Sequence, residues 1–327
     1  MTVSREPRIL IVSTKHDLAT DSVVLRLHGE GVQFYRLNTE DLPSQARASY
    51  LPCEHDIGGT WRTCDGDDVA FGLVRAVWFR RQRLPPKPKG LANTFFEYSV
   101  RECEWFLRGL LYTREAAWMS PPLSLQRAES KMYQLVAAVE AGFLVPATLV
   151  SNDPSDIRAF YAREHGDVVA KPLRLGYFDY GHSQTCVFTS SVSQSDLDCG
   201  AALSCAPVIY QKRVQKVVDI RVTVVGEQVF AAEIDSQSEP TAALDWRQAD
   251  AKLPLSRHRL PDAVCRSCIA LLRSLDLSFG AIDLVLDPDG DYWFLEVNPN
   301  GQWLWIEDEL DYPISEAVAS WLTRHAM

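Results

Sequence analysis

The chain has 327 residues, with 43 acidic residues against 33 Lys and Arg, and a formal net charge of −10. This length allows two or three domains with a sizeable core, and a composition of 46% apolar and 23% charged residues is ordinary for a globular protein. The acidic balance argues against a nucleic-acid binder with a basic surface, and no uncharged apolar run of about 18 residues predicts a transmembrane helix. We therefore expect a cytoplasmic protein with neither a nucleic-acid nor a membrane partner.

The eight cysteines match no zinc-ligand spacing. Cys265 and Cys268 form a C-x-x-C, but it lies inside the amphipathic pattern PDAVCRSCIALLRSL rather than at a helix start after a strand. Ordinary reduced cysteines on one helix face are the favoured interpretation, and a redox pair is the alternative. A reducing cytoplasm fits the first.

The first 120 residues are predicted to form an N-terminal α/β domain. RILIVS, DSVVLRLHGEGV and QFYRLN are typical of strand, helix and strand, with Thr20 or Asp21 as the helix cap. Short antiparallel strands are expected over 40–70, a strand over 74–81 and a long helix within 92–118. The breaker sequence MSPP at 119–122 ends this domain.

A central domain is predicted over 121–206 and a C-terminal domain over 207–327. The central part begins with one helix over about 126–141, which places Lys131 one turn inside it, and continues with strands such as DVVAKPL and a hairpin in GYFDYGHSQTCVFTS. The C-terminal part has hairpins at Gly226 and Asp289-Gly290, and helices over 261–276 and at the end. Residues 307–309 are expected to start a solvated helix, and Trp303 and Trp305 to pack rather than bind substrate.

The last hairpin is predicted to bring two carboxylates together. If Asp289-Gly290 is a two-residue loop, Asp283 lies opposite Glu296 and Asn298 shares their face. A four-residue loop keeps this arrangement and a three-residue bulged turn breaks it. Facing like charges destabilise a sheet, so either a hard cation such as Mg²⁺ lies between them or this is a solvated polar face.

No P-loop and no G-x-G-x-x-G occurs, so phosphates would have to be held by separate cations. Four candidates lie in or near predicted strands and helices: Lys131, Lys171, Arg221 and Arg247. Lys171 is unusual because it interrupts the apolar strand VVAKPL. Each of them alone is also explained structurally, since a lysine stem can lie along apolar surface without a ligand.

Together these features resemble the ATP-grasp superfamily over nearly the whole chain. The resemblance implies an α/β and α+β fold with an N-terminal α/β domain, a central lid and a C-terminal antiparallel domain, and ATP and Mg²⁺ as cofactors. It implies these roles: phosphate binding by Lys131, Lys171, Arg221 and Arg247; an adenine-binding hinge at Gln211, Lys212, Arg213 and Val214; ribose contact by Asp219; and magnesium ligation by Asp283, Glu296 and Asn298. The sharp turn expected at Pro299-Asn300-Gly301 would in addition place Asn300 near the phosphates.

A narrower resemblance is to the graspetide (microviridin-type) peptide macrocyclases. It is carried by RLNTEDLP, VWFRR, MSPP, VTVVGEQVFAAEIDSQ, DWR and LEVNPNGQWLWIE. These ligases join Asp or Glu side chains of a ribosomal precursor peptide to Ser, Thr or Lys side chains as ω-esters or ω-amides. The resemblance implies a precursor with an acidic, hydroxyl-rich core, a leader-binding segment within 174–200, and a homodimer. The lid loop departs from glycine-dense ATP-grasp lids, since it offers only Gly176 and Gly181.

The expected reaction is activation of a carboxylate as an acyl phosphate, with Lys171, Arg221 and Arg247 as catalytic residues that offset charge on the transferred group. Arg80 and Arg81 follow a strand at the edge where α/β sheets bind ligands, and are predicted to contact the acidic peptide; the alternative is a solvated, proline-stiffened loop. Two rival functions remain open: ligation of a small amino acid or a protein C-terminus, and nucleotide or peptide binding without catalysis.

Overall fold

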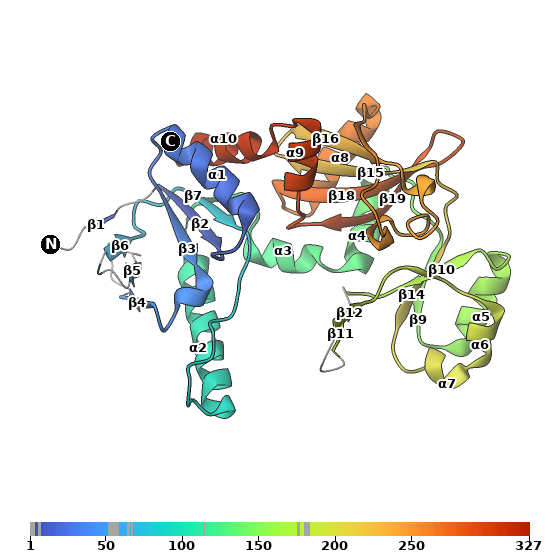
Figure 1. Cartoon of the computed structure of the whole chain (residues 1–327), viewed down its shortest axis with the longest axis horizontal. Helices are drawn as coiled ribbons and strands as arrows, with labels where there is room; N and C mark the ends of the chain where they lie inside the picture. Colours follow the sequence, from blue (N-terminus) through green and yellow to red (C-terminus); the bar gives the residue numbers. More distant parts are fainter. Residues whose placement is uncertain are drawn as a thin grey trace. The chain divides into compact units, whose positions relative to one another are not determined.

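The computed structural model describes residues 4–5, 8–51, 59–63, 66, 68–113, 115–174, 177–179 and 184–327. The chain divides into two compact units (Figure 1). Unit 1 comprises Met1–Pro122, Gln302–Glu307 and Pro313–Met327, and unit 2 comprises Leu123–Gly301 and Asp308–Tyr312. The end of the chain therefore returns to the unit that contains its beginning, and the predicted division into three domains stays a prediction.

Unit 1 is built on a parallel sheet in the order β3-β2-β7-β8. Its strands are β2 (Ile9–Ser13), β3 (Phe34–Asn38), β7 (Ala76–Phe79) and β8 (Ala117–Trp118). Buried side chains on both faces give these strands their continuous apolar character, as expected for a parallel sheet. The strands predicted at 8–13, 33–38 and 74–81 are thus confirmed.

Helices cover both faces of this sheet. On one side α1 (Leu18–Gly29) and α10 (Ile314–Ala326) lie side by side (Figure 1). On the other side α2 (Asn93–Tyr112) packs Leu107, Leu110 and Leu111 against the sheet. The predicted cap of α1, Thr20 or Asp21, was wrong: Asp17 caps the helix by accepting from the amides of Ala19 and Thr20, so the helix begins three or four residues earlier than predicted.

A second, smaller sheet in unit 1 has the order β1-β6-β5-β4. Its strands are β1 (Ser4–Arg5), β4 (Ala46–Tyr50), β5 (Gly59–Thr63) and β6 (Asp68–Ala70). The antiparallel pairing of β4, β5 and β6 confirms the short strands predicted within 40–70. Cys53 and Cys64 lie outside the described residues.

Unit 2 contains a five-stranded antiparallel sheet in the order β17-β16-β15-β18-β19. Its strands are β15 (Val218–Val225), β16 (Gln228–Ile234), β17 (Leu255–Arg257), β18 (Phe279–Leu286) and β19 (Tyr292–Asn298). Helix α8 (Asp262–Ser274) covers one face and carries Cys265 and the buried Cys268 as free thiols. Gly280 allows this close approach, because a Cβ there would lie 2.8 Å from the Leu272 side chain. The antiparallel C-terminal fold is confirmed.

A four-stranded sheet in the order β13-β10-β14-β9 forms the other part of unit 2. Its strands are β9 (Thr148–Ser151), β10 (Val168–Lys171), β13 (Ser190–Ser191) and β14 (Val208–Lys212). Helices α5 (Pro154–Arg163), α6 (Gln194–Asp198) and α7 (Gly200–Leu203) accompany it, and Ile157, Phe160, Leu197 and Leu203 fill its core. The predicted lid hairpin is β11 (Tyr177–Asp179) with β12 (Gln184–Cys186).

The single helix predicted over 126–141 is two helices, α3 (Pro122–Ala128) and α4 (Lys131–Glu140). The chain breaks at Glu129 and Ser130, and Ser130 takes an extended conformation as the N-cap residue of α4. Lys131 is therefore the first residue of a helix rather than a residue one turn inside it. The remaining elements are the short helices η1 (Thr39–Asp41), η2 (Ser236–Ser238) and η3 (Trp246–Gln248), and α9 (Leu304–Leu310). Among the described residues, no helix combines the length and apolar character needed to cross a membrane.

Candidate active site

The last hairpin places Asp283 directly opposite Glu296, as predicted, but by a different route. Leu286 pairs with Tyr292, so the turn is longer than two residues and shifts the register by one. A β-bulge between Leu284 and Asp283 leaves Leu295 as the extra residue and restores the pairing. Asn298 lies two residues beyond Glu296 and pairs with Ala281, so it shares the face of both carboxylates.

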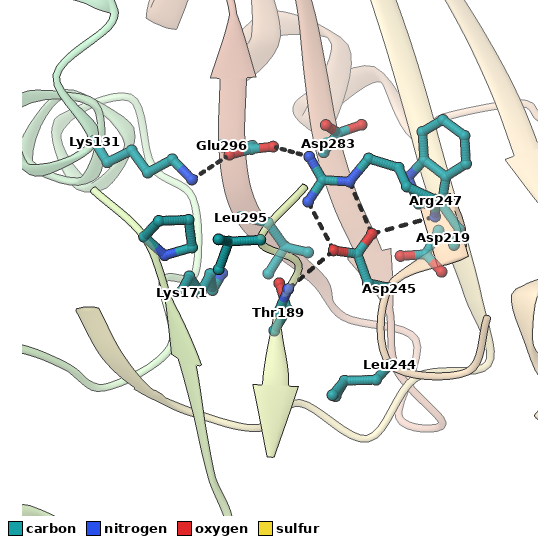
Figure 2. Close-up of a pocket in the computed structure, with 13 residues that line it drawn as sticks. Lys131, Lys171, Thr189, Asp219, Leu244, Asp245, Arg247, Asp283, Leu295 and Glu296 are labelled. Atoms are coloured by element: carbon teal, nitrogen blue, oxygen red, sulfur yellow. Dashed lines mark hydrogen bonds and ion pairs between the residues drawn. The ribbon is translucent and has the colours of Figure 1, made fainter. Parts of the chain in front are cut away.

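Two cations approach Glu296 from different elements (Figure 2). The Nζ of Lys131, at the start of α4, lies 3.0 Å from Oε2, and a terminal nitrogen of Arg247 lies 3.6 Å from Oε1. Burial alone would raise the pKa of Glu296, but Lys131 and Arg247 outweigh burial and lower it. Glu296 is therefore ionised, with a cation beside each of its carboxylate oxygens.

Asp283 has a separate partner on the neighbouring strand. One terminal nitrogen of Arg221 lies 2.9 Å from both carboxylate oxygens, and Arg221 pairs with Asp283 in the strand register. Burial raises the pKa of Asp283 in spite of Arg221, and the charge of Glu296 raises it further. The ionised form of Asp283 is therefore disfavoured, and any additional positive charge at the site would stabilise it.

Asp245 and Asp219 are two further carboxylates that line the pocket. Asp245 caps η3 and holds the Arg247 guanidinium through two hydrogen bonds of 2.8 and 2.7 Å, and it also accepts from the amide of Thr189. Asp219 on β15 pairs with Lys216 at 2.7 Å. Burial raises the pKa of Asp219, whereas Arg247 keeps the pKa of Asp245 below its usual value in spite of burial. Each of these four carboxylates thus has its own cation.

Lys171 is the exception among the pocket cations. It ends β10 and lines the pocket, yet within the described residues it forms no ion pair. Burial lowers its pKa to about 8, and the charge of Glu296 only partly offsets that effect. A half-buried lysine without a carboxylate partner is a cation ready to bind an incoming anion.

A second cavity of about 560 Å³ continues from this pocket and shares Lys171, Thr189, Leu244 and Leu295 with it. The predicted hinge residues line it: Gln211, Lys212, Arg213 and Val214. The Gln211 side chain donates to Thr148, and Arg213 pairs with Asp167 at 2.7 Å, so both side chains are directed to protein partners. The apolar side chains of Val285 and Leu295 also line this cavity and would suit a flat ring.

Solved structures similar to this chain include ligases crystallised with peptides. The macrocyclase MdnC from Microcystis aeruginosa MRC, bound with precursor peptide MdnA, is 30% identical with a TM-score of 0.84, over 97% of this chain and 99% of that chain. A RiPP-associated ATP-grasp ligase from Chryseobacterium gregarium, in complex with ADP and a leader and core peptide, is 27% identical with a TM-score of 0.90, over 98% and 97%. The macrocyclase MdnB from Microcystis aeruginosa MRC is 29% identical with a TM-score of 0.79, over 97% and 99%.

The family model described as MvdD pre-ATP grasp domain matches residues 8–125. No curated protein sequence matches the chain. The match to MdnC covers both chains almost completely. The chain belongs to the graspetide-type ATP-grasp ligases. The predicted family, fold class and ligase activity are thereby confirmed.

In this ATP-grasp ligase the residues expected to bind magnesium offer a donor set that fits. Asp283, Glu296 and Asn298 present carboxylate and amide oxygens on one face, and hard oxygen ligands are those that Mg²⁺ prefers. The raised pKa of Asp283 also fits a cation site, since a bound cation would stabilise the ionised carboxylate and lower this pKa. The Asn298 Oδ1 already accepts from the amide of Asn300 at 3.1 Å, and neither asparagine is among the residues lining the pocket.

Two positioning residues were missed by sequence reasoning. The side-chain amide of Gln134, buried on α4, donates to the carbonyl of Val297 and accepts from its amide, which holds β19 next to Glu296. Gly301 leaves room for Arg221, because a Cβ at this position would lie 2.8 Å from the guanidinium and 2.3 Å from the Cβ of Ala281. A glutamine in an amphipathic helix and a glycine in a turn carry no local signal for such long-range contacts.

The predicted peptide contact at Arg80 meets a different environment in unit 1. Its side chain is 0% exposed, lies 3.4 Å from Asp17, donates to Gln302 and sits over the Trp303 ring at 4.8 Å. Burial lowers the pKa of Arg80 to about 10. Such a side chain presents no surface to a peptide, whereas Arg81, also paired with Asp17, keeps 44% of its side chain exposed.

The acidic run after the tryptophans was predicted to be solvated, and this was wrong for Glu307. Its carboxylate is buried, pairs with Arg26 at 2.8 Å and accepts from the amide of Ser315 at 3.0 Å. Trp303 is fully buried and donates from its indole nitrogen to the Ser315 hydroxyl, in agreement with the packing role expected for it. In the segment 174–200 expected to bind a leader, residues 175–176 and 180–183 lie outside the described residues.

Proposed function

We propose that the chain uses ATP and Mg²⁺ to activate Asp or Glu side chains of a ribosomal precursor peptide, and joins them to Ser or Thr hydroxyls or Lys amines. The products are ω-esters or ω-amides that close rings within the peptide. The observation that carries the proposal is the pocket of Asp283 and Glu296, in which facing carboxylates are held by Arg221, Lys131 and Arg247 beside the uncommitted Lys171. These are the groups that a magnesium-bound triphosphate requires.

The ion pairs of the pocket indicate how a nucleotide would be bound. Asp283, Glu296 and Asn298 would hold Mg²⁺, which supplies charge neutralisation at the phosphates. Lys131, Arg221 and Arg247 then exchange carboxylate oxygens for phosphate oxygens, and Lys171 adds a fourth cation. Because Lys131, Arg221 and Arg247 are already placed by carboxylates, little reorganisation is needed on binding.

The covalent chemistry takes place on the peptide. A carboxylate oxygen attacks the γ-phosphorus of ATP and ADP leaves; a hydroxyl or amine then attacks the acyl carbon, inorganic phosphate leaves and the attacking group loses its proton. Arg221, Arg247 and Lys171 serve by offsetting the charge that develops on the transferred group, and the protein must keep water from the acyl phosphate. No covalent enzyme intermediate is required.

The neighbouring cavity would take the nucleoside. Gln211–Val214 would meet the adenine edge through the backbone, since the side chains of Gln211 and Arg213 are directed elsewhere. Asp219, which lines the adjoining first pocket, would lie near the ribose. The peptide's leader is assigned to the segment 174–200 on resemblance, and the reaction is assigned to the cytoplasm, where ATP is supplied. These assignments share the test of the main proposal.

The test uses a short acidic, Ser- and Thr-rich peptide encoded beside the gene for this chain. With enzyme, ATP and Mg²⁺ the peptide is expected to lose the mass of one water for each linkage and to release one ADP. Mild alkali should restore the mass where the linkage is an ester and leave amides intact. An unchanged peptide mass contradicts the proposal, and ADP release driven by free amino acids alone would instead favour a ligase for small amino acids.

A further inference from the structure

A cavity of about 340 Å³, the edge cavity, lies at the carboxyl edge of the parallel sheet of unit 1 and is lined by residues 15–16, 40–41, 45, 83–84 and 86. These residues belong to the loops that follow β2, β3 and β7, which are neighbours in the sheet. The chain leaves β2 for α1 on one face of the sheet and leaves β7 for α2 on the other, so the two loops diverge. Open α/β sheets bind ligands in the crevice at such a point.

Glu40 lines the edge cavity with a carboxylate that is only half satisfied. The residue is 8% exposed, and its Oε1 accepts from the amide of Lys15 at 2.8 Å, which fixes the orientation of the carboxylate. The second oxygen, Oε2, is buried and has no hydrogen-bond partner within the described residues. A buried acceptor in this state has lost its hydrogen bonds to water without replacement, so a donor from elsewhere would stabilise it.

Glu40 also differs from the other buried carboxylates that the structure describes. Each of the others has a cation at 2.7 to 3.4 Å: Asp17 has Arg80, Asp219 has Lys216, Asp245 has Arg247 and Glu307 has Arg26. Glu40 has none within the described part of the chain, and a buried charge without a partner is costly. Since no three His, Cys, Asp or Glu side chains among the described residues are grouped for a metal ion, the fitting partner is an organic cation that carries N–H donors.

The cations that line the edge cavity do not fill this role. The ammonium of Lys15 pairs with Asp41 and donates to Gln45. Arg83 is exposed, and within the described residues its guanidinium has no partner. Its backbone is fixed, however, because the Thr39 hydroxyl accepts from the Arg83 amide at 2.8 Å and donates to the Arg83 carbonyl at 2.9 Å. A guanidinium held at the cavity in this way is suited to a carboxylate of the ligand.

The two unpaired groups therefore fit a ligand that carries charges of both signs. An ammonium or guanidinium group would donate to Glu40, and a carboxylate would pair with Arg83. Leu84, which is 52% exposed, and Pro86 supply apolar surface for an aliphatic stem between these charges. The volume of the cavity lies at the lower end of the range for small-molecule sites. Lysine and arginine combine a basic end, an aliphatic stem and a carboxylate at this scale.

We propose that the edge cavity of unit 1 binds lysine or arginine, with the basic side chain donating to Glu40 Oε2 and a carboxylate paired with Arg83. Because Oε2 is itself buried, the ligand enters by displacing an exposed side chain of the cavity. The ligand has two possible sources. It is either the free amino acid, which supplies its own carboxylate, or a lysine or arginine residue of a peptide in which Asp or Glu is adjacent.

This binding goes beyond the proposed function, because neither a nucleotide nor ligation takes part in it. All of its measurements are made without ATP, so a failure here leaves the test of the ligase reaction untouched.

Calorimetric titration of the full-length chain at pH 7 tests the ligand class. The free probes are L-lysine and L-arginine, compared with L-norleucine, and the peptide probe is end-blocked Asp-Lys-Asp, compared with Asp-norleucine-Asp. A basic probe should bind at least about tenfold more tightly than its norleucine counterpart, which has no charge to donate to Glu40. Binding of a free amino acid identifies the first source, and binding of the tripeptide alone identifies the second. If no basic probe binds more tightly than its counterpart, the proposal is overturned.

Glu40→Gln tests the buried carboxylate. The variant should weaken binding of the basic probe about 10- to 100-fold, whereas the control Glu97→Gln, at an exposed position on α2, should leave it unchanged. Denaturant unfolding without ligand separates binding from structure: the amide removes an unpaired buried charge, so the Glu40 variant should be no less stable than the native chain. Unchanged affinity, or a clear loss of stability, would show that Glu40 has its partner inside the chain and would overturn the proposal.

Arg83→Gln tests the carboxylate contact. It should weaken the basic probe that binds, but leave unchanged the affinity of the matching probe without a carboxylate, which is cadaverine for L-lysine, agmatine for L-arginine and end-blocked Asn-Lys-Asn for the tripeptide. Lys87→Gln in the same loop is the matched control, since the Lys87 ammonium donates to Asn93 and does not line the cavity. An Arg83 variant that binds the basic probe as tightly as the native chain would contradict the assigned carboxylate contact.

Discussion

Two clusters of arginine and carboxylate side chains in this protein are similar in composition but differ in whether a ligand can reach them. In unit 1, Arg80 and Asp17 lie at the carboxyl edge of the parallel sheet with side chains 0% and 1% exposed. In unit 2, Arg221 and Asp283 sit at 8% and 16%, beside Glu296 at 22% and Arg247 at 36%. The first cluster is sealed by Trp303, whereas the second opens on a pocket.

The difference shows that residue type and strand end do not by themselves identify a binding group. Arg80 follows a strand at the edge where α/β sheets bind ligands, whereas Arg221 lies inside the antiparallel strand β15. Only the second can exchange its carboxylate for a ligand, because only there does space adjoin the ion pair. We expect the cluster around Arg80 to contribute to stability and the cluster around Arg221 to contribute to catalysis.

The largest effect is expected from Arg80→Met. Removing the guanidinium leaves the buried Asp17 without one of its cations, and breaking a buried pair costs about 3–5 kcal/mol of unfolding free energy. Arg81→Met is the matched control, since Arg81 shares Asp17 but is partly exposed and should cost less than about 1 kcal/mol. Denaturant unfolding measures both. Equal losses of unfolding free energy in the two variants would contradict this role of Arg80. A raised KM for the peptide in a fully folded Arg80 variant would instead indicate that Arg80 contacts the substrate.

Glu296→Gln should act on turnover instead. The amide keeps the shape but loses the charge that holds Lys131 and Arg247 and that is assigned to Mg²⁺, so peptide cyclisation should fall at least about 100-fold. Glu309→Gln is the control, because Glu309 pairs with Lys252 at an exposed surface. Peptide binding measured without nucleotide should be retained. Native turnover in the Glu296 variant would contradict the assigned site.

The sequence was sufficient for the strand pattern, because buried apolar runs and hairpin turns are local signals. It also predicted the correct pairing of Asp283 with Glu296, although the predicted turn was too short. The longer loop shifts the strand register by one residue, and the bulge at Leu295 shifts it back. It could not separate Arg80 from Arg221, nor show that Glu307 is buried. Those properties depend on contacts between residues more than 200 positions apart, such as Arg80 with Gln302 and Arg26 with Glu307.

The smallest expected effect is a pH dependence of nucleotide affinity that results from the titration of Lys171. Its pKa is lowered to about 8, so the ammonium is charged below pH 8 and neutral above it. Nucleotide affinity should therefore fall about tenfold between pH 7 and 9 as this cation is lost. Stability should change in the opposite sense: the unfolded chain keeps the proton up to the ordinary lysine value of 10.5, so unfolding free energy rises between pH 8 and 10.5.

Lys171→Met separates these effects from other titrations. The variant should bind nucleotide weakly at every pH and lose the decline between pH 7 and 9, because methionine has no charge to lose. Lys131 is the informative comparison: its partner Glu296 holds it in an ion pair, so a Lys131→Met variant should bind weakly yet keep the decline. Calorimetric titration of ADP with Mg²⁺ at three pH values decides between them. A decline that survives in the Lys171 variant would assign the titration to another group and make Lys171 a structural lysine, like the sealed Arg80 of unit 1.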